Sequence, residues 1–231
     1  MTITIVCDIL GEENNGTTIA CMNLIRYLRA QGHTVHLGGN IGTPLFDRIP
    51  DIRPDDFAVL ELSSFQLHSM HCAPDVAIIT NISPNHLDVH PDLEDYVSAK
   101  CSIYRGQRPD GVLVLNARDA HTPRFAAEAP GSVRYFSSIG PVENGVYCSD
   151  GVIYRAHEGK AEKLIDVSDI RIPGAHNVEN YMAAFAATDG LVGQAACVHV
   201  ARSFAGVAHR MERIRELNGI TFINDSIASS P

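Results

Sequence analysis

Short apolar runs alternate with helical patterns along most of the chain. Four runs have the length of buried strands, and they cover residues 2–10, 57–64, 75–83 and 111–119. Apolar residues at helical spacing predict helices over residues 17–32, 91–107, 176–192 and 196–207. Because strands that alternate with helices are joined by crossover connections, we expect an α/β fold with a mostly parallel central sheet flanked by helices.

The second half of the chain departs from this alternation at two places. Residues 141–172 contain turn glycines between short alternating runs, which predicts a small antiparallel β meander. Residues 211–226 predict a hairpin on a type I′ turn at Asn218-Gly219. Because a two-stranded hairpin is marginally stable alone, we interpret residues 208–231 as the truncated start of a further domain, which follows a main domain at residues 1–207.

Composition narrows the classes of partner. The chain has 231 residues, 45% of them hydrophobic, and a formal net charge of −9, which argues against a nucleic-acid backbone as ligand. Its six cysteines show no C-x-x-C spacing, as expected of reduced thiols in a cytosol. No apolar run approaches the roughly 20 residues that span a bilayer, and no basic segment precedes the apolar N-terminus. We therefore expect a cytoplasmic protein without a nucleic-acid or membrane partner.

The stretch LGEENNGTTIACMNLIRYL, residues 10–28, looks like a phosphate-binding loop that lacks one residue. Gly11, Gly16 and Thr18 satisfy the pattern G-x-x-x-x-G-K-[ST], but Thr17 stands where the lysine is required. Two interpretations are open at this point. The stretch is either a degenerate nucleotide site or an ordinary strand-to-helix turn that contains glycines.

Polar residues follow two of the predicted strands. Glu61 stands near the end of an apolar run, with Ser63 shortly after it. In open α/β sheets, ligands bind outside the carboxyl ends of the strands, so Glu61 is a candidate metal ligand or general base. The alternative is a strand-end carboxylate that neighbouring N–H groups satisfy. His86, Asp88 and His90 stand close together in the loop after the next strand. His86 could ligate a cation or position a phosphate there.

The alternative for this second loop is a capped turn that leads into a helix starting at Pro91 or Asp92. Lys100 lies on the apolar stripe of that helix, where a lysine normally extends its ammonium group to solvent. A functional Lys100 would instead point toward Glu61 and His86. Further along, Asn177 and Asn180 are three residues apart and share a helix face, so their amides can meet a ligand, unless Asn177 is simply an N-cap.

Taken together, these residues resemble a known family. The segments GGNIGTPLF, VLELSSFQL, TNISPNHLDVH, YVSAKCSIY and PGAHNVENYMAAFAA, in this order, are similar to the Mur ligases of peptidoglycan synthesis. The form LELSSFQL looks most like the branch of the family that adds D-glutamate, and residues 208–231 look like the start of the family's third domain. The resemblance covers roughly residues 5–231, which would correspond to the central ATP-binding domain and the first hairpin of the third domain, without the first domain.

The resemblance implies a reaction and its substrates. ATP phosphorylates the carboxylate of a UDP-muramoyl peptide precursor to an acyl phosphate. The amine of D-glutamate then attacks, and the tetrahedral intermediate collapses to an amide. Because a carboxylate must attack a polyanion, Mg²⁺ ions and cationic side chains have to screen the repulsion.

The resemblance also assigns roles to residues. Glu61 and His86 match magnesium-binding positions, and Lys100 matches a lysine that CO2 carbamylates and that supports the second metal. Thr18 matches the loop hydroxyl that binds Mg²⁺. Asn40 and Ser63 are assigned to the substrate. The positions assigned to the nucleotide are Asn15, Gly16, Thr17, Thr18, Asn177, Asn180, Arg210 and Asp225.

The family pattern GTNGKTT falls on ENNGTTI, residues 13–19. Asn15, Gly16 and Thr18 are retained, whereas Glu13 stands at a glycine position and Thr17 at the lysine position. The lysine normally supplies a charge to the β- and γ-phosphates, and removing one electrostatic donor typically lowers a rate on the order of 10²–10³-fold. We therefore expect weak or absent ATP turnover by this chain.

Three other interpretations remain open. The chain could be a non-catalytic remnant or nucleotide-binding module that keeps the fold. It could be a partitioning or transport ATPase, although such a protein needs the lysine and a Walker-B aspartate, whereas the second strand here ends in Glu61. Folylpolyglutamate synthase shares the loop and the carbamylated lysine, but LELSSFQL and INDS fit it less well.

Overall fold

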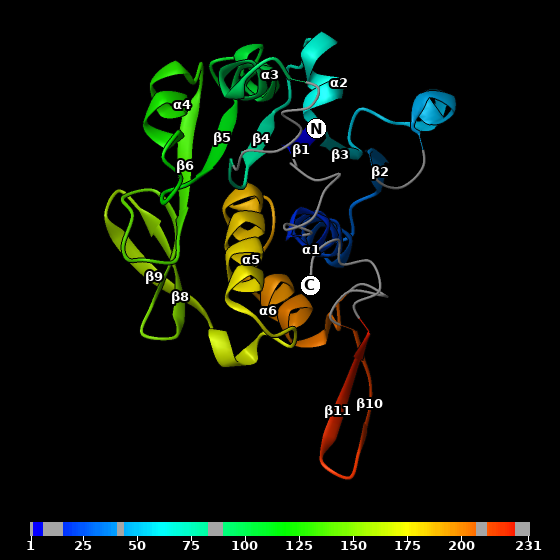
Figure 1. Ribbon diagram of the computed structural model, residues 1–231, viewed down its shortest axis with the longest axis vertical. Coiled ribbons are helices and arrows are strands. Elements are labelled where there is room, and N and C mark those ends of the chain that lie inside the picture. Colours follow the sequence, from blue (N-terminus) through cyan, green and yellow to red (C-terminus); the bar gives the residue numbers. More distant parts are fainter. Residues whose placement is uncertain (1, 7–15, 41–43, 83–89, 207–211, 225–231) are drawn as a thin grey trace.

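The computed structural model describes residues 2–6, 16–40, 44–82, 90–206 and 212–224, and it shows a three-layered α/β domain with a projecting hairpin (Figure 1). The strands of the main sheet are β1 Thr2–Val6, β2 Val35–Gly39, β3 Phe57–Leu62, β4 Val76–Ile79, β5 Val112–Asn116, β6 Ser132–Ser137, β7 Gly145–Ser149, β8 Val152–His157 and β9 Lys160–Asp166. The hairpin consists of β10 Glu212–Leu217 and β11 Ile220–Asn224. The α-helices are α1 Gly16–Ala30, α2 Ser64–Ser69, α3 Leu93–Arg105, α4 Thr122–Glu128, α5 Ala175–Thr188 and α6 Gln194–Ser203. Two 3₁₀ turns cover Phe46–Asp51 and Val167–Asp169.

The main sheet has nine strands in the order β2-β3-β1-β4-β5-β6-β7-β8-β9. The pairs from β2 to β7 are parallel, and β7, β8 and β9 pair antiparallel. The predicted fold class, a mostly parallel sheet with an antiparallel meander, is therefore confirmed. The meander is not a separate unit, because β7 pairs directly with β6 and extends the parallel sheet.

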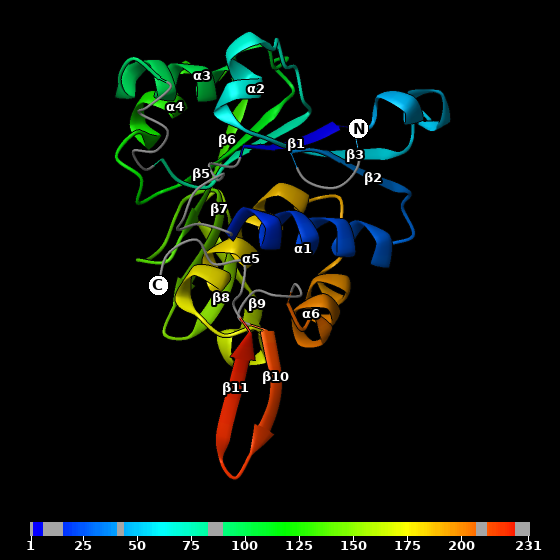
Figure 2. The ribbon, with the colours of Figure 1, turned by 45° about the vertical axis from the view of Figure 1, so that its right-hand side comes forward.

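Helices cover both faces of the sheet, and this explains the continuous apolar character of the central strands. The side chains of α1, α5 and α6 form one core with Phe57 and Val59 of β3, whereas those of α2, α3 and α4 form a second core with Leu62 of the same strand. Figure 2 shows α1, α5 and α6 on one side of the sheet and α2, α3 and α4 on the other. Alternate residues of β3 thus face opposite layers.

Most predicted elements are present with shorter bounds. The strand expected over residues 75–83 is β4, Val76–Ile79, and the helix expected over 91–107 is α3, which Asp92 caps by accepting a hydrogen bond from the backbone N–H of Asp95. The alternative given for the loop that contains His90, a capped turn leading into a helix, is therefore confirmed at Asp92. The pattern did not predict β2, β6, α2 or α4, which are short elements with mixed polarity.

The hairpin forms a two-stranded sheet of its own and extends away from the main domain in both views (Figures 1 and 2). Asn218 and Gly219 have φ values of 52° and 78°, as a type I′ turn requires. Apolar side chains of both strands are exposed, including Ile214, Ile220 and Phe222. The interpretation of residues 208–231 as the start of a further domain stays a prediction.

Candidate functional site

Glu61 is buried near the carboxyl end of β3, with 1% of its surface exposed. It follows Phe57 and Val59 on the face of the strand that packs toward α1. Burial first and the charge of Glu61 second raise the pKa of the Cys21 thiol on α1. Cys21 and Val59 belong to the same core, so this face of β3 packs against the helix that begins at Gly16.

The end of β2 approaches the backbone of Glu61 closely. The backbone N–H of Asn40 donates to the carbonyl oxygen of Glu61 at 2.7 Å. Gly39 has a φ of +100°, and a Cβ atom there would lie 2.0 Å from the same carbonyl oxygen. Glycine is therefore required at this position, both for its φ and for the close approach. The arrangement places Asn40 beside Glu61, although the two lie far apart in the sequence.

Lys100 is fully buried in the middle of α3, with 0% of its surface exposed. Of the two alternatives that the sequence left open, the one in which the ammonium group extends to solvent is therefore wrong. Its Nζ lies 4.9 Å from the centroid of the Tyr96 ring, one helical turn earlier, so the side chain leans toward the start of α3. Gln107, which follows the helix, donates from Nε2 to the carbonyl oxygens of Pro74 and Val112, both at 3.0 Å, at the amino ends of β4 and β5. Lys100 consequently points away from that edge and toward the carboxyl edge of the sheet.

Asn177 and Asn180 are buried in the first turns of α5. The interpretation of Asn177 as an N-cap is wrong, because α5 begins at Ala175 after Gly174, and the Asn177 amide donates instead to the carbonyl oxygen of Pro173. Within the part of the chain that the structure describes, Oδ1 of Asn177 and Nδ2 of Asn180 are buried without a hydrogen-bond partner. One acceptor and one donor are thus available for a polar ligand.

The start of α5 is tied to the carboxyl edge of the sheet. Glu179 accepts hydrogen bonds from Arg118 Nη1 at 3.2 Å and from Ser138 Oγ at 2.5 Å, and these residues follow β5 and β6. Asn177 and Asn180 therefore lie at the same edge as Glu61, because all these strands are parallel.

The loops after β4 and β5 carry polar residues that the sequence reasoning missed. The backbone N–H of Ile82 donates to Asp119 Oδ2 at 2.5 Å, and Asn116 accepts from the backbone N–H of Arg118 at 3.0 Å. The first contact joins the loops after β4 and β5 at the carboxyl edge, and the second lies within the loop after β5. The available signal was a polar residue directly after the apolar run VLVL, the same signal that identified Glu61.

The structure brings part of the predicted set together. Glu61 and the backbone of Asn40 lie at the carboxyl edge, Glu61 on the α1 face of the sheet. Lys100 leans toward the same edge from α3 on the opposite face, and Asn177 and Asn180 approach it from α5. At that edge, Ser63 caps α2 in a capping box with Gln66, whose backbone N–H donates to Ser63 Oγ at 3.4 Å. Gly16 opens α1, and helix N-termini favour anions. Four predicted residues lie outside the described part of the chain: Asn15, His86, Arg210 and Asp225.

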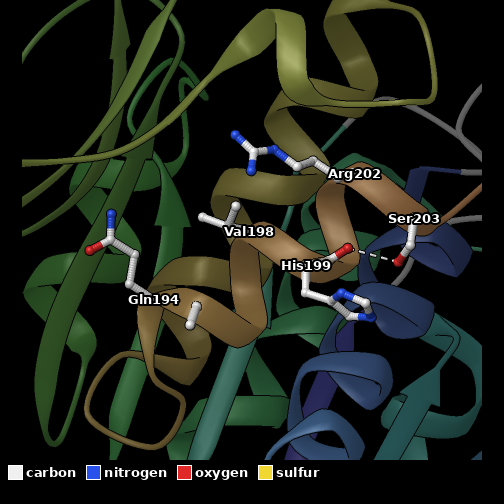
Figure 3. Close-up of a pocket in the computed structure, with 6 residues that line it drawn as sticks. Gln194, Val198, His199, Arg202 and Ser203 are labelled. Atoms are coloured by element: carbon white, nitrogen blue, oxygen red, sulfur yellow. Dashed lines mark hydrogen bonds between the residues drawn. The ribbon is translucent and has the colours of Figure 1, made fainter.

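A hollow of about 570 Å³ lies elsewhere, along α6 (Figure 3). Residues of α6 line it, among them Gln194, His199 and Arg202, and Ser203 Oγ donates to the carbonyl oxygen of His199 at 2.7 Å. None of the predicted site residues lines this hollow. The candidate site is therefore the carboxyl edge of the sheet and not this surface.

Comparisons with known proteins agree with this fold. Residues 9–188 match the family model described as the Mur ligase middle domain. The chain is 48% identical over 219 residues to the UDP-N-acetylmuramoylalanine--D-glutamate ligase of Acetivibrio thermocellus, which covers 94% of this chain and 47% of that relative. It is 46% identical over 223 residues to the ligase of the same name from Clostridium botulinum, covering 96% of this chain and 47% of that one.

A solved structure of a Mur ligase has the same fold. The structure of a UDP-N-acetylmuramoyl-L-alanyl-D-glutamate--2,6-diaminopimelate ligase superposes with a TM-score of 0.71 at 22% identity, over 94% of this chain and 48% of the other. At this identity the likeness shows the fold. The chain spans about half the length of the curated relatives it matches.

Proposed function

This chain belongs to the Mur ligase family through its middle domain, and we propose that it serves in the ATP-dependent joining of D-glutamate to a UDP-N-acetylmuramoyl-alanine precursor. The observation that carries the proposal is the identity to D-glutamate ligases over nearly the whole chain. We place the reaction in the cytoplasm, because its nucleotide substrates are there. In the described part of the chain, no helix is long and apolar enough to cross a membrane.

The substrates pose an electrostatic problem, which is the approach of a carboxylate to the γ-phosphate of ATP. The residues at the carboxyl edge fit a divalent cation, because the buried Glu61 carboxylate is a hard oxygen ligand. In the proposal Glu61, His86 and the Thr18 hydroxyl hold Mg²⁺, which screens the repulsion between the two anions when it is bound. Asn40 and Ser63 orient the acceptor substrate beside them.

The nucleotide would extend from the start of α1 toward α5. The phosphates would be bound by backbone N–H groups of Asn15, Gly16 and Thr17, as they are in other phosphate loops. The buried Asn177 Oδ1 and Asn180 Nδ2 offer one acceptor and one donor to the adenosine end. Arg210 and Asp225 would complete the nucleotide site.

The burial of Lys100 fits the proposed carbamylation. A role in the site would explain why a lysine on the apolar stripe of α3 is fully buried. The neutral amine attacks CO2, an N–C bond forms, one proton is released, and a carbamate replaces the cation. The Lys100 side chain would then end in a carboxylate, which would supply a further oxygen ligand for a metal ion at the carboxyl edge.

A second candidate function is a nucleotide-binding module without ligase activity. The observation that favours it is the loop itself, because Thr17 replaces the lysine and Glu13 replaces a glycine. Under this alternative the fold persists, but the charge that the γ-phosphate needs is missing.

A chimeric ligase separates the two functions. The segment of the Acetivibrio thermocellus ligase that aligns with this chain is replaced by this chain, with either Thr17 or a lysine in its place. We expect D-glutamate-dependent phosphate release from the Thr17→Lys chimera, and release roughly 10²-fold slower from the unaltered chimera. A folded Thr17→Lys chimera that releases no phosphate in response to D-glutamate would contradict the ligase proposal and favour the module.

A further inference from the structure

Two histidines and an aspartate gather where α2 meets α3. His68 lies in the last turn of α2, His90 precedes the α3 N-cap, and Asp95 lies in the first turn of α3. Each residue offers one ligand atom, and these atoms lie within 4.8 Å of one another. None of the three belongs to the set assigned above to nucleotide, substrate or Mg²⁺.

Asp95 joins the two imidazoles. His90 Nδ1 lies 2.7 Å from Asp95 Oδ2, and His68 Nε2 lies 3.3 Å from Asp95 Oδ1. Bonds of about 2.0–2.1 Å to Zn²⁺ place tetrahedral ligand atoms roughly 3.3 Å apart. Small rotations of the side chains therefore bring two nitrogens and one carboxylate oxygen into metal-binding positions.

The remaining atoms of the cluster support such a site. His90 is buried, and its Nε2 lies 3.1 Å from Ser64 Oγ. A metal ion bound at Nδ1 would take the place of the hydrogen bond between Nδ1 and Asp95, and the ring hydrogen would then lie on Nε2 and be donated to the Ser64 hydroxyl. His68 has 57% of its side chain exposed, which leaves a solvent-facing entry path.

We propose that His68, His90 and Asp95 form a binding site for a divalent transition-metal ion, with Zn²⁺ as the preferred occupant. Two imidazoles and one carboxylate suit Zn²⁺, whereas Mg²⁺ prefers oxygen ligands. Three protein ligands leave the fourth position open to water on the His68 side. A bound ion would cross-link the end of α2 to the start of α3, and it would thereby stabilise these two helices beside the candidate active site.

The test is a zinc titration of the full chain against a chromophoric chelator, with Mg²⁺ in excess. We expect one equivalent of Zn²⁺ to bind, and His68→Asn to weaken that binding at least tenfold. Because the His68 side chain is exposed, this variant should fold, and circular dichroism verifies it. Co²⁺ should give tetrahedral d–d absorption with the unaltered chain and lose it with His68→Asn.

The matched control is His199→Asn, which removes an exposed histidine on α6, far from the cluster in sequence. It should bind Zn²⁺ as the unaltered chain does. The proposal is overturned if the unaltered chain shows no saturable binding, if His68→Asn binds within threefold of it, or if His199→Asn weakens binding as much as His68→Asn.

Discussion

Replacing Thr17 by lysine is expected to tighten the binding of a non-hydrolysable ATP analogue to this chain by roughly 10- to 100-fold. The reason is electrostatic, because a hydrogen bond to a charged group contributes about 1.5–3 kcal/mol and a phosphate-loop lysine supplies such a bond to the β- and γ-phosphates. The unaltered chain has Thr17 there, with Glu12 and Glu13 adding like charge nearby. Isothermal titration calorimetry in the presence of Mg²⁺ measures the difference.

The matched control for this prediction is Thr17→Met, which lengthens the side chain without adding charge. It should bind the analogue as weakly as the unaltered chain. Micromolar binding by the unaltered chain would contradict the account of the loop, and equal affinities of the lysine and methionine variants would show that charge is not the missing element.

The second large effect is expected at Lys100. In the chimeric ligase with Thr17→Lys, we expect Lys100→Gln to lower D-glutamate-dependent phosphate release on the order of 10²–10³-fold. Glutamine fills much of the same buried space but cannot be carbamylated. The chimera that retains Lys100 should also lose activity in buffer depleted of CO2 and regain it when bicarbonate is added, whereas the glutamine variant should not respond.

An exposed lysine provides the control. Lys163 on β9 pairs with Asp166 at 2.7 Å and is about half exposed, so Lys163→Gln should leave the rate unchanged. Circular dichroism is needed for Lys100→Gln, because Lys100 is fully buried and its loss could unfold α3. A folded Lys100→Gln chimera with the full rate would remove Lys100 from the site.

The sequence predicted the elements whose pattern reflects burial. The runs of β3, β4 and β5 are apolar because helices cover both of their faces. The strand β6 was not predicted, because only its last two residues are buried. It also carries a charged residue, Arg134, whose guanidinium donates to the carbonyl oxygens of Ala186 and Asp189. The helix α2 has six residues, too few to show helical periodicity.

The candidate site could be predicted where a single charged residue interrupts an apolar pattern. Glu61 is a charge in an apolar strand, and Lys100 is a charge on an apolar helix stripe, and both are indeed buried. Contacts between distant segments left no such signal. The pairing of His68 with Asp95 and the hydrogen bond from Ile82 to Asp119 depend on how the loops fold at the sheet edge, which no local pattern encodes.

We propose that Glu61 at the carboxyl end of β3 holds a magnesium ion that the nucleotide shares. Calorimetric titration of the Thr17→Lys chain with the ATP analogue, with and without Mg²⁺, tests it when repeated on the Thr17→Lys, Glu61→Gln double variant. We expect Mg²⁺ to strengthen binding of the analogue to the single variant and to have little effect on binding to the double variant. An equal gain from Mg²⁺ in both variants would contradict it.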